Sequence, residues 1–92
     1  MSYRVEVLPA AGRDLARLPA GVQERILAHL FALREDPRPP GSAGLAGKPA
    51  GRRKLRVGAY RVVYTVKDEA LVVLVIAVGH RSRVYKQAER RE

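Results

Sequence analysis

Apolar and polar side chains alternate at the start of the chain, over Tyr3–Leu8. This period of two is typical of a strand with one buried face. Pro9 ends that strand and is favoured in the first turn of a helix. Helical spacing then predicts two helices, a short one closed by Pro19 and a longer one ending at Asp36, before a proline. Their apolar stripes consist of Ala11, Leu15 and Leu18, and of Val22, Ile26, Leu30 and Leu33 with Leu27 beside them.

A change of composition interrupts this pattern over Pro37–Gly51. The segment holds four of the six prolines and four of the eight glycines, so it is predicted to be a loop within the domain. Strand-like runs follow at Arg52–Val57, Tyr60–Lys67 and Leu71–Val78. Gly58-Ala59 and Asp68-Glu69 separate these runs and predict tight hairpin turns.

The last of these runs, LVVLVIAV, is apolar at every position. It is therefore expected in the middle of the sheet with both faces covered. The predicted order β-α-α-β-β-β places a helical hairpin against a mainly antiparallel sheet, which defines an α+β fold in a single domain, residues 1–92. The polar tail His80–Glu92 is compatible with a short final helix.

The charge of the chain is unevenly distributed. The 92 residues carry 18 basic and 9 acidic side chains, for a net charge of +9. Residues 1–47 hold six arginines against five acids, whereas residues 48–92 hold twelve basic residues against four acids. Such asymmetry indicates a binding face in the second half of the chain, for nucleic acid or for an acidic protein.

The expected hairpin concentrates these cations on one face. A two-residue turn at Gly58-Ala59 pairs Val57 with Tyr60 and Arg56 with Arg61, unless a bulge shifts the register. Alternation then gives one face Arg52, Lys54, Arg56 and Arg61, and the other Leu55, Val57, Tyr60, Val62 and Tyr64. Because like charges opposite each other destabilise a sheet, the pair of arginines indicates a functional role.

A second segment is expected to reach the same place. The strand that ends at Val78 runs antiparallel to the preceding strand, so Gly79–Tyr85 arrives beside Arg61. This segment brings His80, Arg81, Arg83 and Tyr85 to the patch. Basic side chains neutralise phosphates and an aromatic ring stacks on an unpaired base, so the patch is predicted to bind RNA.

The residue types at the patch favour phosphoryl transfer without a metal or cofactor. The chain has no cysteine, its two histidines are far apart, and no carboxylate pair lies near the patch. Arginines can stabilise the charge on a pentacoordinate phosphorus. Lys54, whose charged form the arginines disfavour, is expected to take the proton of a 2′-hydroxyl. Arg81 or His80 would protonate the leaving 5′-oxygen.

Several segments resemble the RelE/ParE superfamily of bacterial and archaeal toxins. They are the run KLRVGAYRVVY at 54–64, the sequence VGHR at 78–81 with Tyr85 beyond it, and Leu45-x-Gly47. The resemblance implies a RelE-like fold, similar to that of small microbial ribonucleases, and a toxin of a type II toxin–antitoxin system. RelE-like members cut messenger RNA in the ribosomal A site, whereas ParE-like members poison DNA gyrase.

The resemblance also implies a role for each residue of the patch. Lys54 matches the lysine that acts as base or stabilises the transition state, and Arg61 matches the phosphate-stabilising arginine. Arg81 matches the proposed general acid, and Tyr85 matches the tyrosine that stacks on the substrate base. The family's upstream lysine is Arg52 here, which can bind phosphate but not act as a base. The remaining substrate-binding residues are then expected to be Arg56, His80 and Arg83.

The same resemblance implies partners. A RelE-like toxin acts on the ribosome and mRNA and is held inactive by an acidic, RelB-like antitoxin that wraps it in a hetero-oligomer. No apolar run has the length of a membrane span and the first residues do not resemble a signal peptide, so a cytoplasmic protein is expected. The sequence leaves two alternatives open, a ParE-like gyrase inhibitor and a noncatalytic module that binds RNA or ribosomes.

Overall fold

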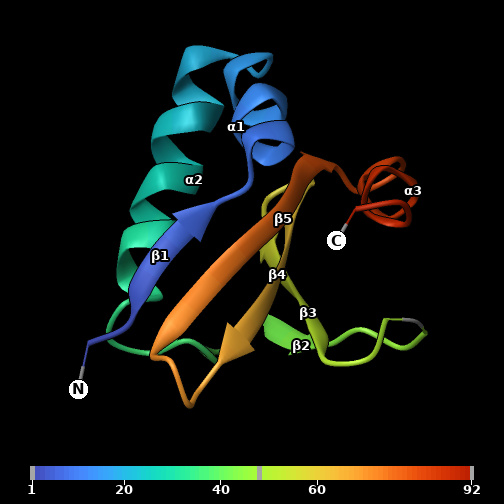
Figure 1. Ribbon diagram of the computed structural model, residues 1–92. Helices are drawn as coiled ribbons and strands as arrows, with labels where there is room; N and C mark the ends of the chain where they lie inside the picture. The colour runs from blue at the N-terminus through green and yellow to red at the C-terminus, as the bar shows by residue number, and fades with distance from the viewer. Residues whose placement is uncertain (1, 48, 92) are drawn as a thin grey trace.

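The fold is built on a five-stranded sheet, with its strands in the order β1-β5-β4-β3-β2 (Figure 1). The structure is a computed structural model that describes residues 2–47 and 49–91. Its elements are β1 Arg4–Val7, α1 Pro9–Ala16, α2 Ala20–Ala32, β2 Ser42–Gly44, β3 Arg52–Val57, β4 Tyr60–Lys67, β5 Val72–His80 and α3 Val84–Ala88. The predicted α+β fold is confirmed, including the short final helix.

Strand β5 lies inside the sheet, as its apolar sequence predicts. It pairs in parallel with β1 on one side and antiparallel with β4 on the other. The remaining pairs, β4–β3 and β3–β2, are antiparallel. Residues 72–79 are all buried, because the sheet is covered on both faces at this strand.

The two faces of the sheet carry separate apolar cores. On one face, α1 and α2 form the helical hairpin, and Ile26, Leu30 and Leu33 pack against residues such as Val62 and Tyr64. On the other face, α3 contributes a smaller cluster in which Val84 and Ala88 contact Val63, Leu74, Ile76 and Ala77. Figure 1 accordingly places α3 across the sheet from the helical hairpin.

A β-bulge at Ile76 explains how β5 serves both cores. Val63 pairs with Ala77 and Tyr64 with Val75, so Ile76 is an extra residue on β5. Ile76 and Ala77 consequently both join the cluster beneath α3. Val75 before the bulge and Val78 after it both face the helical hairpin.

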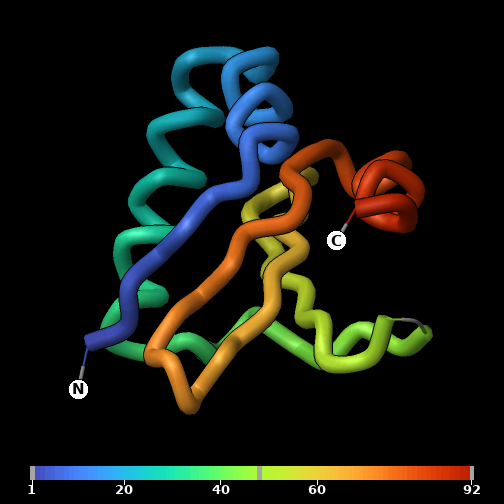
Figure 2. Tube along the Cα trace, viewed as in Figure 1, coloured from blue at the N-terminus to red at the C-terminus, as the bar shows by residue number. Residues whose placement is uncertain are grey.

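Three boundaries differ from the sequence-based expectation. Helix α2 ends at Ala32 rather than Asp36, and the carbonyl of Arg34 then accepts the N–H of Tyr3 at 2.8 Å. The expected loop 37–51 contains the edge strand β2, paired with β3, and Figure 2 traces the path of the backbone from α2 to β3. The turn after β4 has four residues, 68–71, and Leu71 adopts a φ of 54°, so β5 begins at Val72 and extends to His80.

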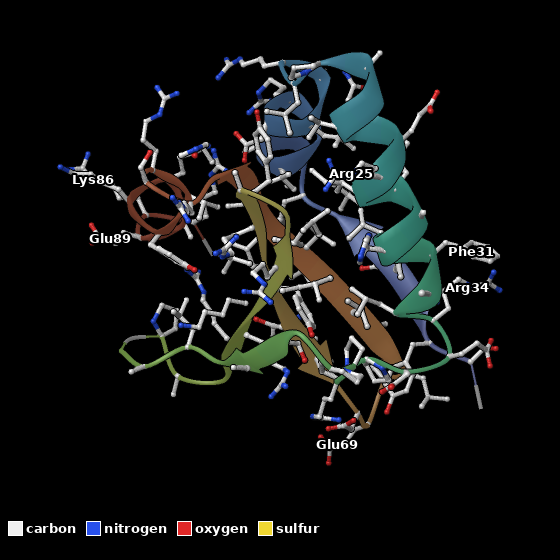
Figure 3. All side chains as sticks on the ribbon, turned by 180° about the vertical axis from the view of Figure 1, so that it is seen from behind. Arg25, Phe31, Arg34, Glu69, Lys86 and Glu89 are labelled. Carbon is white, nitrogen blue, oxygen red and sulfur yellow. The ribbon has the colours of Figure 1, made fainter. Side chains whose placement is uncertain are left out.

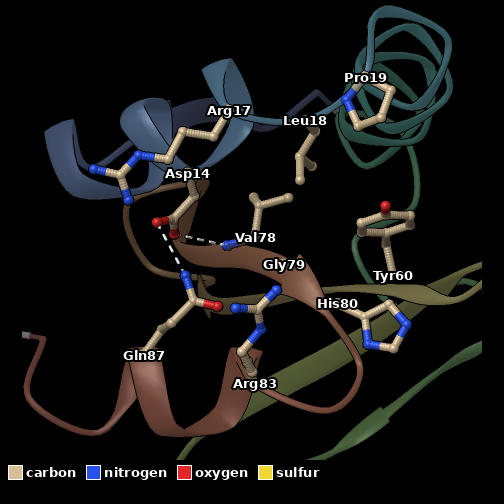
Figure 4. Close-up of a pocket in the computed structure, with 10 residues that line it drawn as sticks. All are labelled: Asp14, Arg17, Leu18, Pro19, Tyr60, Val78, Gly79, His80, Arg83 and Gln87. Carbon is tan, nitrogen blue, oxygen red and sulfur yellow. Dashed lines mark hydrogen bonds between the residues drawn. The ribbon is translucent and has the colours of Figure 1, made fainter.

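A buried carboxylate, not anticipated from the sequence, joins α1 to β5 and the C-terminal segment. Asp14 accepts the N–H of Val78 at 3.1 Å, the Gln87 side-chain amide at 3.1 Å and the Arg91 guanidinium at 2.5 Å. Figure 4 draws the first two bonds. Arg91 also donates to the carbonyl of the bulged Ile76 at 3.0 Å. Hydrogen bonding to Asp14 raises the pKa of Arg91 above its ordinary value.

A second polar cluster ties the other end of the sheet to the chain after α2. Asp68 accepts the Tyr3 hydroxyl at 2.8 Å and pairs with the Arg38 guanidinium at 2.8 Å. Hydrogen bonds from Arg38 and then from Tyr3 lower the pKa of the Asp68 carboxyl to about 2. The cluster is exposed to solvent, so its effect on stability is expected to be small.

Replacing Asp14 by alanine is expected to lower the free energy of unfolding by about 3 kcal/mol. The substitution leaves a buried N–H and a half-buried guanidinium without their acceptor. Urea denaturation followed by circular dichroism measures the loss. Glu24→Ala, which removes an exposed carboxylate from α2, serves as the control and should stay within about 0.5 kcal/mol of wild type. Equal effects of the two substitutions would contradict the role assigned to Asp14.

The Asp68 cluster predicts a defined pH dependence. Because the folded-state pKa is lowered, its stabilisation is complete above the ordinary value of 3.8 and is lost as the pH falls through about 2. Carboxyl carbon chemical shifts measured by NMR between pH 1.5 and 6 report the midpoint directly. Arg38→Ala should move the Asp68 midpoint up towards 3.8, whereas Glu69→Gln should leave it near 2. An unchanged midpoint in the Arg38 variant would show that Arg38 is not its cause.

Candidate active site

The β3–β4 hairpin has the register predicted from its two-residue turn. Val57 pairs with Tyr60, and Arg56 lies directly opposite Arg61. Gly58 in the turn has a φ of 61°, and a side-chain carbon there would lie 2.7 Å from the Arg25 guanidinium. Arg25 reaches this turn from α2, on the side that faces the sheet (Figure 3). Glycine is therefore favoured at this position for its positive φ, and a larger residue would also displace the flexible Arg25 side chain.

Four of the predicted site residues line one cavity of about 420 Å³, which we call the cationic hollow. Lys54 and Arg56 come from β3, Arg61 from β4 and Tyr85 from α3. Gly41, Ser42 and Ala43, at the edge of the sheet, complete its wall. The contribution of this edge was missed from the sequence because its strand lies within a segment rich in proline and glycine.

The Arg61 guanidinium is held in a fixed position. Its Nη1 donates to the carbonyls of Gly58 and Tyr60, both at 2.8 Å. Its Nε and Nη2 groups have no acceptor among the described residues, so they remain available to an anion. A donor whose orientation is fixed before the substrate binds is suited to stabilising charge that develops during a reaction.

Carboxylates are absent from the described lining of the cationic hollow. Lys54 is half-buried and forms no ion pair with any residue in 2–47 or 49–91. Asp68 and Glu69 lie in the turn at the opposite end of β4 (Figure 3). The hollow is therefore a region of uncompensated positive charge, which attracts phosphate groups.

Arg52 occupies a different place from the one expected. It is 5% exposed, and its guanidinium donates to the carbonyls of Ala88, at 2.6 Å, and of Arg91. It does not line the cationic hollow. Its bonds hold the end of α3 against β3, and so fix the helix that carries Tyr85. This position gives Arg52 a structural contact that the alternation pattern alone could not reveal.

The remaining predicted residues follow β5. Arg81 is exposed in the turn after the strand, where its backbone N–H donates to the carbonyl of Ala59 at 2.9 Å. This bond places the turn beside the β3–β4 turn, as expected. The His80 ring meets Tyr60 edge-on with 5.7 Å between centroids, and its Nδ1 lies 2.8 Å from the Ser82 hydroxyl.

His80 and Arg83 line a separate cavity of about 520 Å³, which we call the edge pocket (Figure 4). It lies between α1, the end of β5 and α3. Its wall is formed by Asp14, Arg17, Leu18, Pro19, Tyr60, Val78, Gly79, His80, Arg83 and Gln87. The eight predicted residues are thus distributed between two cavities, the exposed Arg81 turn and the buried position of Arg52.

Neither cavity offers an evident metal site. Within the described part of the chain, no three histidine, cysteine, aspartate or glutamate residues are grouped so that they could hold a metal ion. None of the described helices combines the length and apolar character needed to cross a membrane. The side chains that gather in the hollow are instead those that bind and stabilise phosphate, namely arginine and lysine.

Comparison with known proteins agrees with the fold. The family model described as ParE toxin of type II toxin–antitoxin system, parDE, matches residues 5–85. The chain is 37% identical to mRNA interferase toxin RelE of Escherichia coli K12, over 99% of this chain and 98% of that one. It is 36% identical to toxin RelG of Mycobacterium tuberculosis, over 95% of this chain and all of that one.

Solved structures of related toxins have the same fold. The toxin–antitoxin complex RelBE2 of M. tuberculosis matches with a TM-score of 0.79 and 30% identity, over 88% of this chain and 100% of the matched chain. A free E. coli toxin RelE with two arginine-to-alanine substitutions matches with a TM-score of 0.78 and 33% identity, over 96% and 95% of the two chains. The resemblance stated from the sequence is confirmed: this chain belongs to the ParE toxin family of type II toxin–antitoxin systems and is a RelE-like member of it.

Proposed function

We propose that this protein is an mRNA interferase, a toxin that cleaves messenger RNA in the ribosomal A site and thereby stops translation in the cytoplasm. The observation that carries the proposal is the convergence of Lys54, Arg56, Arg61 and Tyr85 in one hollow. The E. coli relative named mRNA interferase toxin RelE, similar over nearly the whole chain, supports the same activity.

In this proposal the RNA supplies its own nucleophile. Lys54, in its neutral form, takes the proton of a 2′-hydroxyl, and the 2′-oxygen forms a bond to the adjacent phosphorus. Arg61 and Arg56 neutralise the additional negative charge on the phosphate oxygens. The bond from phosphorus to the 5′-oxygen then breaks, and that oxygen takes a proton. The products are a 2′,3′-cyclic phosphate and a 5′-hydroxyl end.

The exposed turn after β5 supplies the final proton in this scheme. His80 is the chemically simpler acid, because imidazolium loses its proton near neutral pH. Its ring, however, lines the edge pocket, whereas Arg81 lies in the turn beside Ala59. The resemblance favours Arg81, which would also bind the phosphate.

Tyr85 orients the substrate base by stacking, and its place on α3 makes this role dependent on the C-terminal segment. The ring is half-buried and packs against the core beneath α3 while it lines the hollow. Arg52 contributes indirectly, since its bonds to the end of α3 fix the helix. Because the Tyr85 ring is already held in place, it loses less conformational entropy when a base stacks on it.

An acidic antitoxin is the proposed regulator. Similar structures include the RelB–RelE complexes of Pyrococcus horikoshii and E. coli, in which a toxin is bound to its antitoxin. In this chain, the net charge of +9 and the uncompensated hollow favour a partner rich in aspartate and glutamate. A bound acidic segment would compete with phosphate for the same arginines.

Substitution of hollow residues tests the catalytic assignment. Arg61→Ala and Lys54→Ala should each slow mRNA cleavage by about 100-fold or more, because each removes a group that acts in the transition state. The rate is measured on ribosomes programmed with a defined codon in the A site, with the cleaved ends mapped by primer extension. Lys67→Ala removes an exposed cation from the far end of β4 and should cleave at the wild-type rate.

Three results would contradict this proposal. Cleavage by Arg61→Ala at the wild-type rate would remove that residue from the site. Inhibition of DNA gyrase by stoichiometric protein, with ribosomal mRNA left intact, would identify a ParE-like poison. Salt-sensitive binding to RNA with no cleavage product would indicate a noncatalytic module.

A further inference from the structure

The edge pocket is a charged cavity that lies outside the proposed catalytic site. Its volume of about 520 Å³ lies within the range of small-molecule sites. Arg17 and Arg83 are exposed at its wall and form no ion pair with any residue in the described ranges. Its lining has one described carboxylate, Asp14, whose oxygens are engaged by Val78, Gln87 and Arg91. The pocket therefore presents positive charge to solvent.

One wall of the edge pocket is aromatic and apolar. Tyr60 and His80 meet edge-on there, and Leu18 and Pro19 continue the wall towards α2 (Figure 4). The Tyr60 hydroxyl has no hydrogen-bond partner among the described residues. Figure 4 shows the Arg83 guanidinium pointing from α3 towards Gly79, across the pocket from Tyr60. A phosphate near the arginines and a planar base near Tyr60 match this distribution of side chains.

The edge pocket and the cationic hollow lie on the two sides of α3. Val84 and Ala88 of this helix face the sheet, Tyr85 faces the hollow, and Arg83 and Gln87 face the pocket. On β4, the neighbouring residues Tyr60 and Arg61 likewise point to opposite faces and serve one cavity each. Arg81 follows the pocket residue His80 in an exposed turn, and its backbone N–H binds the carbonyl of Ala59 in the β3–β4 turn.

We propose that the edge pocket is a second RNA subsite, which binds a nucleotide of the same RNA that occupies the cationic hollow. Arg17 and Arg83 bind its phosphate and Tyr60 contacts its base, while Arg81 contacts the backbone between the two sites. This inference rests on the proposed function, because the RNA must enter the hollow first. An acidic peptide would find the same arginines but would leave the aromatic wall without a partner, so RNA is favoured.

Binding of RNA of two lengths tests the subsite separately from cleavage. Fluorescence anisotropy with labelled oligouridylates of two and eight nucleotides gives the dissociation constants. The longer RNA reaches both cavities, so Arg17→Ala should weaken its binding about tenfold and reduce the slope of log affinity against log salt by about 0.7. Binding of the dinucleotide, which fills one cavity, should be reduced much less.

Arg13→Ala is the matched control, because it removes an exposed arginine from the same helix outside the pocket. It should bind both RNAs as wild type does. Equal weakening by Arg13→Ala and Arg17→Ala would indicate general charge attraction and overturn the subsite. Unchanged RNA affinity in Arg17→Ala, together with weaker binding of an oligoglutamate peptide, would assign the pocket to an acidic protein and also overturn it.

Two further measurements identify the RNA that supplies the nucleotide, and they distinguish a failure of the subsite from a failure of the proposed function. If Arg17→Ala slows cleavage of long mRNA on programmed ribosomes but not of mRNA that ends just beyond the cut, the nucleotide belongs to the messenger. If it weakens binding to vacant ribosomes instead, a ribosomal RNA nucleotide occupies the subsite, and the single-RNA form of the proposal is overturned. If wild type binds long RNA through Arg17 but cleaves none on ribosomes, the subsite stands and the interferase proposal fails.

Discussion

The buried carboxylate of Asp14 determines where the C-terminal segment lies, and much of the site depends on that segment. Strand β1 pairs with β5 only as far as Val75, so the rest of β5 has no neighbouring strand on that side. Asp14 binds the N–H of Val78 there, and Arg91 binds the carbonyl of Ile76 while it pairs with Asp14. The same carboxylate thus accepts the free backbone N–H at the sheet edge and anchors the residues after α3. Because α3 separates the two cavities, the positions of Tyr85 and Arg83 both depend on this contact.

The parts of the site that were predictable depend on local rules. Two residues between strands set the register of β3 and β4, and alternation then placed Lys54, Arg56 and Arg61 together. The convergence of Tyr85 followed from the direction of β5. Asp14, Arg52 and the edge strand β2 were not predictable in this way, because their roles depend on partners between 9 and 77 residues away in sequence. A charged residue in an amphipathic helix gives no local sign that tertiary packing will bury it.

The position of Arg52 does not follow from the alternation of side chains along β3. It shares the pleat of Lys54 and Arg56, yet it is buried beneath the end of α3 while they line the hollow. The difference lies in what covers each part of the strand. Where α3 covers β3, Arg52 holds the helix by hydrogen bonds. Where no helix covers the strand, Lys54 and Arg56 line a cavity that is open to solvent. Arg56 lies opposite Arg61 with no carboxylate in the described lining of the hollow, so their repulsion is uncompensated in the free protein and an anion bound between them would relieve it.

The bulge at Ile76 affects where β5 can tolerate the loss of a residue. Before the bulge, the odd-numbered residues of β5 face the helical hairpin, whereas after it the even-numbered residue Val78 does. The extra residue therefore shifts the alternation of side chains by one position. Removal of one residue before the bulge could be absorbed by straightening it, at the expense of the cluster beneath α3. The same deletion after the bulge would invert Val78, Gly79 and His80, exchanging which side chains reach the edge pocket. Length variation is therefore expected to be restricted between residues 76 and 80 and freer in the turn that follows, where the backbone is exposed.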